Sequence, residues 1–202
     1  MVSARVAEGP AAAELPALHI DSRADAGVYD AINRGIVMSH GRWILILGSD
    51  DRLHADDTLS RAASALSLTS ADMVYGDVRL MASLSDMPAG TRYAGPMSMT
   101  ELLSRNICQQ AVFYRRALFT ALGNFDPRYR ICADWDFNLR VAFRRPIQWI
   151  DLVVADYAAT GMSARGGDKA FDEDLPVRLR KELLQFPQRR ELWPLHRYLL
   201  RH

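Results

Sequence analysis

The chain has 202 residues, 49% of them hydrophobic, and its 25 basic and 24 acidic side chains leave a net charge of +1. This length supports one hydrophobic core, and the composition excludes a disordered chain and a protein held to nucleic acid by bulk charge. Two cysteines, Cys108 and Cys132, are too few for a disulfide framework. The longest unbroken apolar run, residues 43–47, is far shorter than the roughly 20 residues of a membrane-spanning helix. We therefore expect a soluble protein of a reducing compartment, with no nucleic acid partner.

Helical and strand-like patterns alternate along the chain. Apolar residues recur at helical spacing over residues 27–39, and the continuous run 43–47 is typical of a strand buried on both faces of a parallel sheet. Ser98 and Glu101 form a capping-box pattern that starts a short helix. The other predicted helices are 56–68, 116–122 and 134–144, and the other predicted strands are 18–20, 72–77, 110–114 and 147–155. This alternation predicts an α/β fold with a mostly parallel sheet flanked by helices.

The expected organisation is a loose leader over residues 1–17, one α/β domain over 18–172 and a helical tail over 173–202. From Arg178 onward, seven basic residues outnumber two glutamates and are interleaved with aromatic and leucine side chains. Such a tail can lie on an anionic membrane surface. A helix packed on the domain, with a solvated basic face, is the alternative.

Two acidic residues, Asp50 and Asp51, directly follow the predicted strand 43–47. Ligands of open α/β sheets bind at the carboxyl ends of strands, and paired carboxylates suit a hard cation such as Mg²⁺ or Mn²⁺ that holds a phosphate. A simple turn is the alternative, because Gly, Ser and Asp are common turn formers.

A second pair of acids, Asp134 and Asp136, opens the predicted helix 134–144. Acids at a helix N-terminus are favoured by the helix dipole without any function. The functional alternative is a general base that takes a proton from an attacking hydroxyl. The helix over 27–39 offers a third group, in which Asp30 and Arg34 are four residues apart and form either a surface ion pair or part of a site.

Four segments, in this order, resemble the family 2 glycosyltransferases of the GT-A fold over roughly residues 20–165. They are residues 25–35, 46–51 (similar to a Ser-Asp-Asp version of the family's DXD motif), 106–116 and 123–140. The resemblance implies transfer of a sugar, with inversion, from a nucleotide-sugar donor to the hydroxyl of a saccharide or lipid-linked acceptor in polysaccharide or glycoconjugate synthesis. It also implies a cytoplasmic enzyme, in which the basic tail would give peripheral contact with the inner face of the membrane.

The resemblance also implies roles for individual residues. Asp51 would bind Mn²⁺ or Mg²⁺ on the donor diphosphate, and Asp134 would be the general base. The residues implied for donor binding are Asp30, Asn33, Asp50 and Arg165, and those implied for the acceptor pocket are Gln110, Trp135 and Asp136.

The start of the chain differs from the family pattern. The family begins with a strand-helix-strand unit that binds the nucleoside, and residues 1–17, rich in Ala and broken by Pro, are too few for one. We therefore expect an N-terminally truncated GT-A domain. The alternative function is a catalytically inactive remnant that binds a carbohydrate or nucleotide.

Overall fold

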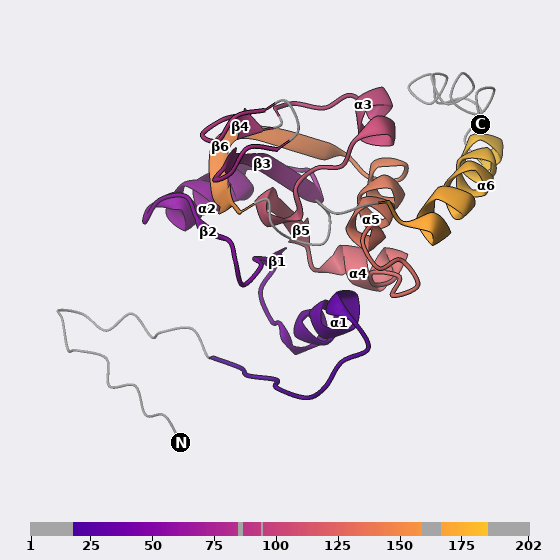
Figure 1. Ribbon diagram of the computed structural model, residues 1–202, viewed down its shortest axis with the longest axis horizontal. Coiled ribbons are helices and arrows are strands. Elements are labelled where there is room, and N and C mark those ends of the chain that lie inside the picture. The colour runs from indigo at the N-terminus through magenta and orange to yellow at the C-terminus, as the bar shows by residue number, and fades with distance from the viewer. Residues whose placement is uncertain (1–17, 85–86, 94, 159–166, 186–202) are drawn as a thin grey trace.

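The computed structural model describes residues 18–84, 87–93, 95–158 and 167–185. Figure 1 shows a central sheet with helices around it, and α5 lies between the sheet and α6, the last helix described. The helices are α1 (Val28–Met38), α2 (Thr58–Leu68), α3 (Met99–Ser104), α4 (Ala117–Leu122), α5 (Ala133–Ala142) and α6 (Lys169–Gln185), with a 3-10 turn η1 at Gln109–Ala111.

The sheet has the strand order β1-β5-β3-β6-β2, and β4 pairs with β3 outside this path. Its strands are β1 (Trp43–Leu45), β2 (Arg52–Leu53), β3 (Met73–Leu80), β4 (Arg92–Tyr93), β5 (Val112–Arg115) and β6 (Ile147–Tyr157). The predicted α/β class, with helices flanking a sheet, is confirmed.

The sheet is mixed, so the prediction of a mostly parallel sheet is wrong. Among the described strands, β3 and β6 pair in parallel, whereas β1/β5, β3/β5, β3/β4 and β2/β6 are antiparallel. The apolar run at 43–47 predicts a strand buried on both faces, but only Ile44 of β1 is buried, because β1 lies at the end of the described strand order. An apolar run also has the same pattern whichever way the neighbouring strand runs. Here β5 lies between β1 and β3 and runs against both.

Most predicted elements occur within a few residues of their expected bounds. The capping box is present, because Ser98 Oγ accepts from the Glu101 amide at 3.2 Å and Glu101 Oε2 accepts from the Ser98 amide at 2.9 Å. The predicted strand at 18–20 is absent. Leu18 and Ile20 are exposed and lie outside any strand, since nothing in the described structure pairs with them.

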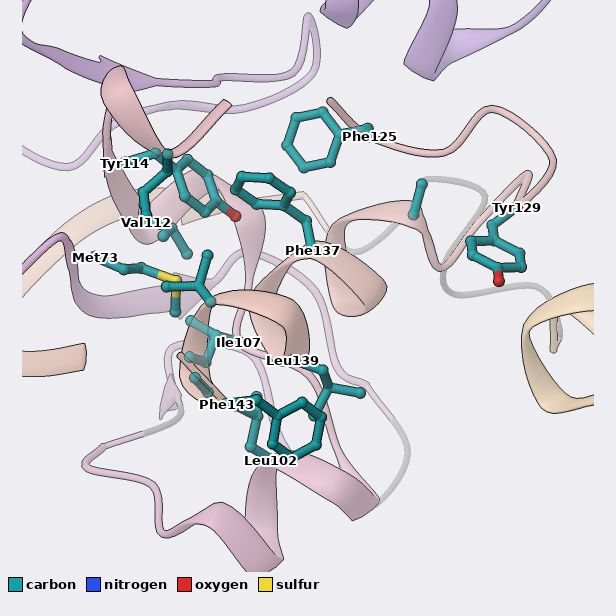
Figure 2. Close-up of a cluster of buried hydrophobic side chains, with 14 of the residues drawn as sticks. Met73, Leu102, Ile107, Val112, Tyr114, Phe125, Tyr129, Phe137, Leu139 and Phe143 are labelled. Carbon is teal, nitrogen blue, oxygen red and sulfur yellow. The ribbon is translucent and has the colours of Figure 1, made fainter. Parts of the chain in front are cut away.

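Buried side chains form two clusters, one on each face of the sheet. Successive residues of β3 alternate between them, so that Met73 joins one cluster and Val74 the other. Figure 2 shows the larger cluster, in which aromatic rings from α5 and β5 meet, with Tyr114 beside Phe137. The rings of Phe119 and Phe137 stack at 4.6 Å. This cluster anchors α5 against the sheet.

The helix α6 runs without a break across the predicted boundary at 172/173. Its buried residues Phe171, Leu175 and Leu179 belong to the larger cluster. The described part of the tail is therefore packed on the domain, while 186–202 and the leader 1–17 lie outside the described residues. Among the helices described, none has the length and apolar character needed to cross a bilayer.

Candidate active site

A cavity of about 270 Å³ lies beside the N-terminus of α5. The side chains around it come from α1, from the segment leading into β5 and from the loop before α5. They include Tyr29, Asn106, Cys108, Gln110, Arg130 and Asp134. Two predicted site residues, Asp134 and Gln110, therefore share one cavity.

Asp134 is held by hydrogen bonds to both of its carboxylate oxygens. The Tyr29 hydroxyl lies 2.8 Å from Oδ1 and 2.7 Å from the carbonyl oxygen of Ile131. The Asn106 side-chain amide donates to Oδ2 at 2.8 Å. Asp134 is also in the first turn of α5, where the helix dipole favours a negative charge.

The protonation of Asp134 reflects a balance between burial and these donors. Burial raises its pKa to about 6, and the hydrogen bonds from Tyr29, the Trp135 amide and Asn106 oppose the rise. A carboxylate with this pKa is mostly ionised at neutral pH yet basic enough to accept a proton, which is what a general base requires.

Asp51 closes the turn between β1 and β2. Its amide donates to the Gly48 carbonyl oxygen at 3.2 Å. Its Oδ2 accepts from the side-chain amide of Gln110 at 2.8 Å, and its Oδ1 accepts from the backbone amide of Ala158 at 3.1 Å. The carboxylate is thus fixed between η1 and the residue that follows β6.

The two acidic motifs lie in one neighbourhood. Gln110 lines the cavity that contains Asp134 and also binds Asp51. Burial raises the pKa of the nearby Cys108 thiol to about 12, and the charges of Asp134 and Asp51 both add to that rise. The fold therefore joins acids that are 83 positions apart in the sequence.

The carboxylates of Asp50 and Asp51 converge over Gly48. A Cβ atom added at Gly48 would lie 2.8 Å from Asp51 Oδ2 and 3.0 Å from Asp50 Oδ1. Two hard oxygen donors placed this way fit a divalent cation that takes its other ligands from phosphate and water. In the described ranges, no group of three or more His, Cys, Asp and Glu side chains is placed to hold an ion by itself. A cation here would therefore depend on the ligand that accompanies it.

The residues assigned to the donor side are not gathered in this cavity. Both ends of the Asn33 amide bind the backbone of Phe125, at 2.8 and 3.1 Å, so this side chain connects α1 to the loop before α5. Asp30 accepts from the Ala26 amide at 3.1 Å and from Arg34 at 3.3 Å, and it lines a neighbouring cavity of about 480 Å³. Arg165 lies outside the described residues.

Trp135 and Asp136 face away from the cavity, although the family resemblance implies both for the acceptor pocket. The Trp135 indole donates to the Leu102 carbonyl oxygen at 2.7 Å and stacks on Phe171. Asp136 is buried and pairs with Arg140, at 2.9 Å, and with Arg178. Residues two apart on a helix point in different directions, so Asp134 and Asp136 cannot share a site on one face of α5.

Tyr29 and Asn106 contact Asp134 but are not among the site residues that the sequence predicts. Tyr29 is 105 positions from Asp134 and Asn106 is 28 positions away. Both lie within segments that carry the family resemblance, which is the one signal in the sequence that points to them. Local periodicity does not, because these contacts arise only when α1 and the segment before η1 pack against α5.

Comparison with known proteins connects the chain to glycosyltransferases. No family model matches it. It is 42% identical over 169 residues to a "PGL/p-HBAD biosynthesis glycosyltransferase" of Mycobacterium bovis, which covers 81% of the chain and 62% of that relative. It is 30% identical over 161 residues to an uncharacterized glycosyltransferase of Mycobacterium tuberculosis, covering 76% of the chain and 59% of that protein. The chain thus spans about three-fifths of the length of these curated relatives.

Solved structures of TarS from S. aureus share the fold. One, of TarS residues 1–349, matches over 81% of this chain and 46% of the TarS fragment, with a TM-score of 0.54 at 16% identity. Another, of the same fragment in complex with UDP-GlcNAc, matches over 78% of this chain and 47% of the fragment, with a TM-score of 0.59. The chain is therefore similar in sequence to mycobacterial glycosyltransferases and similar in fold to TarS.

Proposed function

We propose that this chain is an inverting glycosyltransferase that moves a sugar from a nucleotide-diphosphate sugar to an acceptor hydroxyl. The observation that carries the proposal is the placement of Asp134, a buried carboxylate with a pKa of about 6 on the wall of a cavity. The sequence similarity to named glycosyltransferases supports the reaction class.

Asp134 is the general base of the proposed reaction. Its carboxylate takes the proton of the acceptor hydroxyl while the hydroxyl oxygen forms a bond to the anomeric carbon of the donor sugar. The bond from that carbon to the diphosphate oxygen breaks, and its electron pair leaves with the nucleoside diphosphate. Tyr29 and Asn106 hold the base in place through their hydrogen bonds to its two oxygens.

The donor diphosphate is proposed to lie beside the turn that contains Asp50 and Asp51. These carboxylates would hold Mn²⁺ or Mg²⁺, which offsets the negative charge of a departing nucleoside diphosphate. Gln110 supports this role, because it orients Asp51 from the wall of the cavity that contains the base. A nucleotide-sugar is the donor class that TarS binds in its complex with UDP-GlcNAc.

The acceptor is proposed to be a saccharide or a lipid-linked saccharide. The described part of the tail packs its apolar face on the domain, so contact with an anionic membrane would involve the solvated basic side chains of α6.

The test is release of nucleoside diphosphate from a panel of nucleotide-sugars in the presence of Mn²⁺. Asp134→Asn should lower turnover by about 10²-fold or more, the usual contribution of a general base, and should leave UDP or GDP binding intact. Asp51→Asn should weaken the binding measured by calorimetry with Mn²⁺. Asp57→Asn is the control, because Asp57 is an exposed acid without a capping hydrogen bond and should change neither quantity.

Unchanged turnover in both Asp134→Asn and Asp51→Asn would contradict the proposed roles. Nucleotide binding without turnover for any donor in the panel would favour the inactive binding remnant instead.

A further inference from the structure

A line of side-chain hydrogen bonds runs from the centre of the apolar core to Asp134. The Tyr114 hydroxyl donates to Asn138 Oδ1 at 2.8 Å, and Asn138 Nδ2 donates to Asn106 Oδ1 at 2.9 Å. Asn106 Nδ2 then donates to Asp134 Oδ2 at 2.8 Å. Tyr114 and Asn138 are both fully buried, with relative exposures of 0%.

A backbone amide fixes the direction of this line. Asn106 Oδ1 also accepts from the backbone amide of Ile107 at 2.9 Å, and that group can only donate. The oxygen end of the Asn106 amide is therefore committed, so its nitrogen end faces Asp134. Asn138 must in turn present its nitrogen to Asn106 and its oxygen to Tyr114.

Packing alone does not account for Tyr114 and Asn138. The Tyr114 ring lies among the rings of Phe119, Phe125 and Phe137, with centroids 5.7, 6.1 and 5.4 Å away. Figure 2 shows Tyr114 with Phe125 and Phe137. An apolar side chain would fill such a place without the cost of burying a hydroxyl or an amide. Buried polar groups that are fully hydrogen-bonded rigidify one arrangement, and this one ends on the carboxylate of Asp134.

We propose that Tyr114 and Asn138 are positioning residues that act through Asn106 to keep an amide donor on Asp134, and so keep this carboxylate ionised and in one orientation. The inference rests on the proposed role of Asp134 as the base for its functional meaning, but the arrangement can be tested without turnover. Neither Tyr114 nor Asn138 lines the cavity, so neither is a catalytic residue.

The other ionisable groups around Asp134 would not themselves change its pKa when Tyr114 or Asn138 is substituted. Burial raises the pKa values of Cys108 and Cys132 to about 12, and it also raises the pKa values of Tyr29 and Tyr114, so all four stay neutral near pH 7. The charged groups nearby are Arg130 on the cavity wall, Asp51, which is bound to Gln110 on that wall, and Asp168, which accepts from the amides of Ile131 and Cys132. No change to Tyr114 or Asn138 alters these groups directly.

The test compares Tyr114→Phe with Tyr75→Phe. Tyr75 is a matched control, because it is another buried tyrosine of the same sheet and its hydroxyl makes one hydrogen bond, accepted from the Met97 amide. The readout is the pKa of Asp134 in protein labelled with carbon-13 at the aspartate carboxyls, the signal being assigned by its loss in Asp134→Asn. Where turnover is measurable, the pKa on the acid side of the pH profile of kcat/KM should shift together with the pKa of Asp134.

Tyr114→Phe should raise the pKa of Asp134 by about half a unit or more, because the Asn138 amide loses the donor that polarises it and Asn106 then donates more weakly to Asp134. Asn106→Leu, which removes the donor itself, should raise it by about one unit or more, since a hydrogen bond to a charged group is worth about 1.5–3 kcal/mol. Tyr75→Phe should leave it unchanged. In the wild-type protein, the side-chain amide signals of Asn106 and Asn138 should both titrate with the midpoint of Asp134.

The inference would be overturned if the pKa of Asp134 changes in Asn106→Leu but not in Tyr114→Phe. It would also be overturned if the Asn138 amide signal does not change as Asp134 titrates. Both readouts are independent of turnover. An inactive wild-type protein with the expected pKa changes would contradict the proposed function and leave the positioning role standing.

Discussion

Gln110 donates a hydrogen bond from its side-chain amide to Oδ2 of Asp51 at 2.8 Å, although 59 positions separate the two residues. Gln110 lies in η1, directly before β5, and lines the cavity that contains Asp134. The other oxygen of Asp51 is held by Ala158, just after β6. One carboxylate therefore connects the turn after β1 with η1 and with the residue after β6, and through Gln110 it contacts the wall of the cavity that contains Asp134.

Gln110→Ala should weaken cation-dependent nucleotide binding by about 10-fold, which is typical for loss of a group that orients a metal ligand. Calorimetry with UDP or GDP, with and without Mn²⁺, measures the effect. Gln109→Ala is the matched control: Gln109 is the adjacent glutamine of the same turn and lines the same cavity, while its buried amide nitrogen lacks a hydrogen-bond partner in the described structure. Equal losses in the two variants would show that the Gln110–Asp51 bond has no special role.

Asp134→Asn should stabilise the protein at neutral pH while lowering its turnover. The pKa of Asp134 is raised from 3.8 to about 6, so the folded state binds more protons than the unfolded state between these values. Stability therefore rises as pH falls from about 6 towards 4, and above about pH 6 the buried charge costs up to about 3 kcal/mol. Asparagine removes that charge.

Urea unfolding followed by tryptophan fluorescence should show Asp134→Asn to be about 1–2 kcal/mol more stable than wild type near pH 7.5, with the difference vanishing near pH 4. Asp57→Asn, at an exposed acid, provides the control. A difference that does not change with pH would contradict the raised pKa.

The sequence predicts the elements of this fold better than their arrangement. Helical spacing and the capping box locate α1 and α3, because these signals depend on residues a few positions apart. The directions of β1 and β5 do not follow from their apolar content, since side-chain burial is the same for either direction. The acids Asp51 and Asp134 are recognisable from the sequence, whereas the hydrogen bonds that fix them come from distant segments.

Asp136 illustrates the same limit within one helix. The family resemblance implies that Asp136 shapes the acceptor pocket, but the turn of the helix directs it to Arg140 and Arg178 instead. The local sequence does contain the Arg140 partner, four positions along the helix. The second partner, Arg178, comes from α6 and has no local signal.

Asp136→Ala should therefore act on stability rather than on acceptor binding. Removing one member of a buried ion pair leaves its partners without a counter-charge and costs about 3–5 kcal/mol. Thermal and urea unfolding should show this loss, while Asp172→Ala, at an exposed acid of α6, should change the unfolding free energy by less than about 0.5 kcal/mol. If Asp136→Ala is as stable as wild type but binds the acceptor more weakly, Asp136 has the role in the acceptor pocket that the family resemblance implies.

Gly48→Ala tests whether the convergence of Asp50 and Asp51 matters for a cation. Gly48 has no positive φ angle, so alanine meets no backbone penalty there. Its Cβ would instead lie 2.8 Å from Asp51 Oδ2 and 3.0 Å from Asp50 Oδ1, and it would force these carboxylates to move. We expect Mn²⁺-dependent binding of UDP or GDP to fall by about 10-fold or more, as when a metal ligand loses its orientation.

Gly35→Ala is the control for that substitution. Gly35 lies in α1 with nothing within 4 Å of an added Cβ, so alanine there should stabilise the helix by about 0.5–1 kcal/mol and leave nucleotide binding unchanged. Calorimetry and urea unfolding of both variants separate the two effects. If Gly48→Ala binds Mn²⁺ and nucleotide as wild type does, the two carboxylates do not act together on a cation, and the proposed donor site must lie elsewhere in the chain.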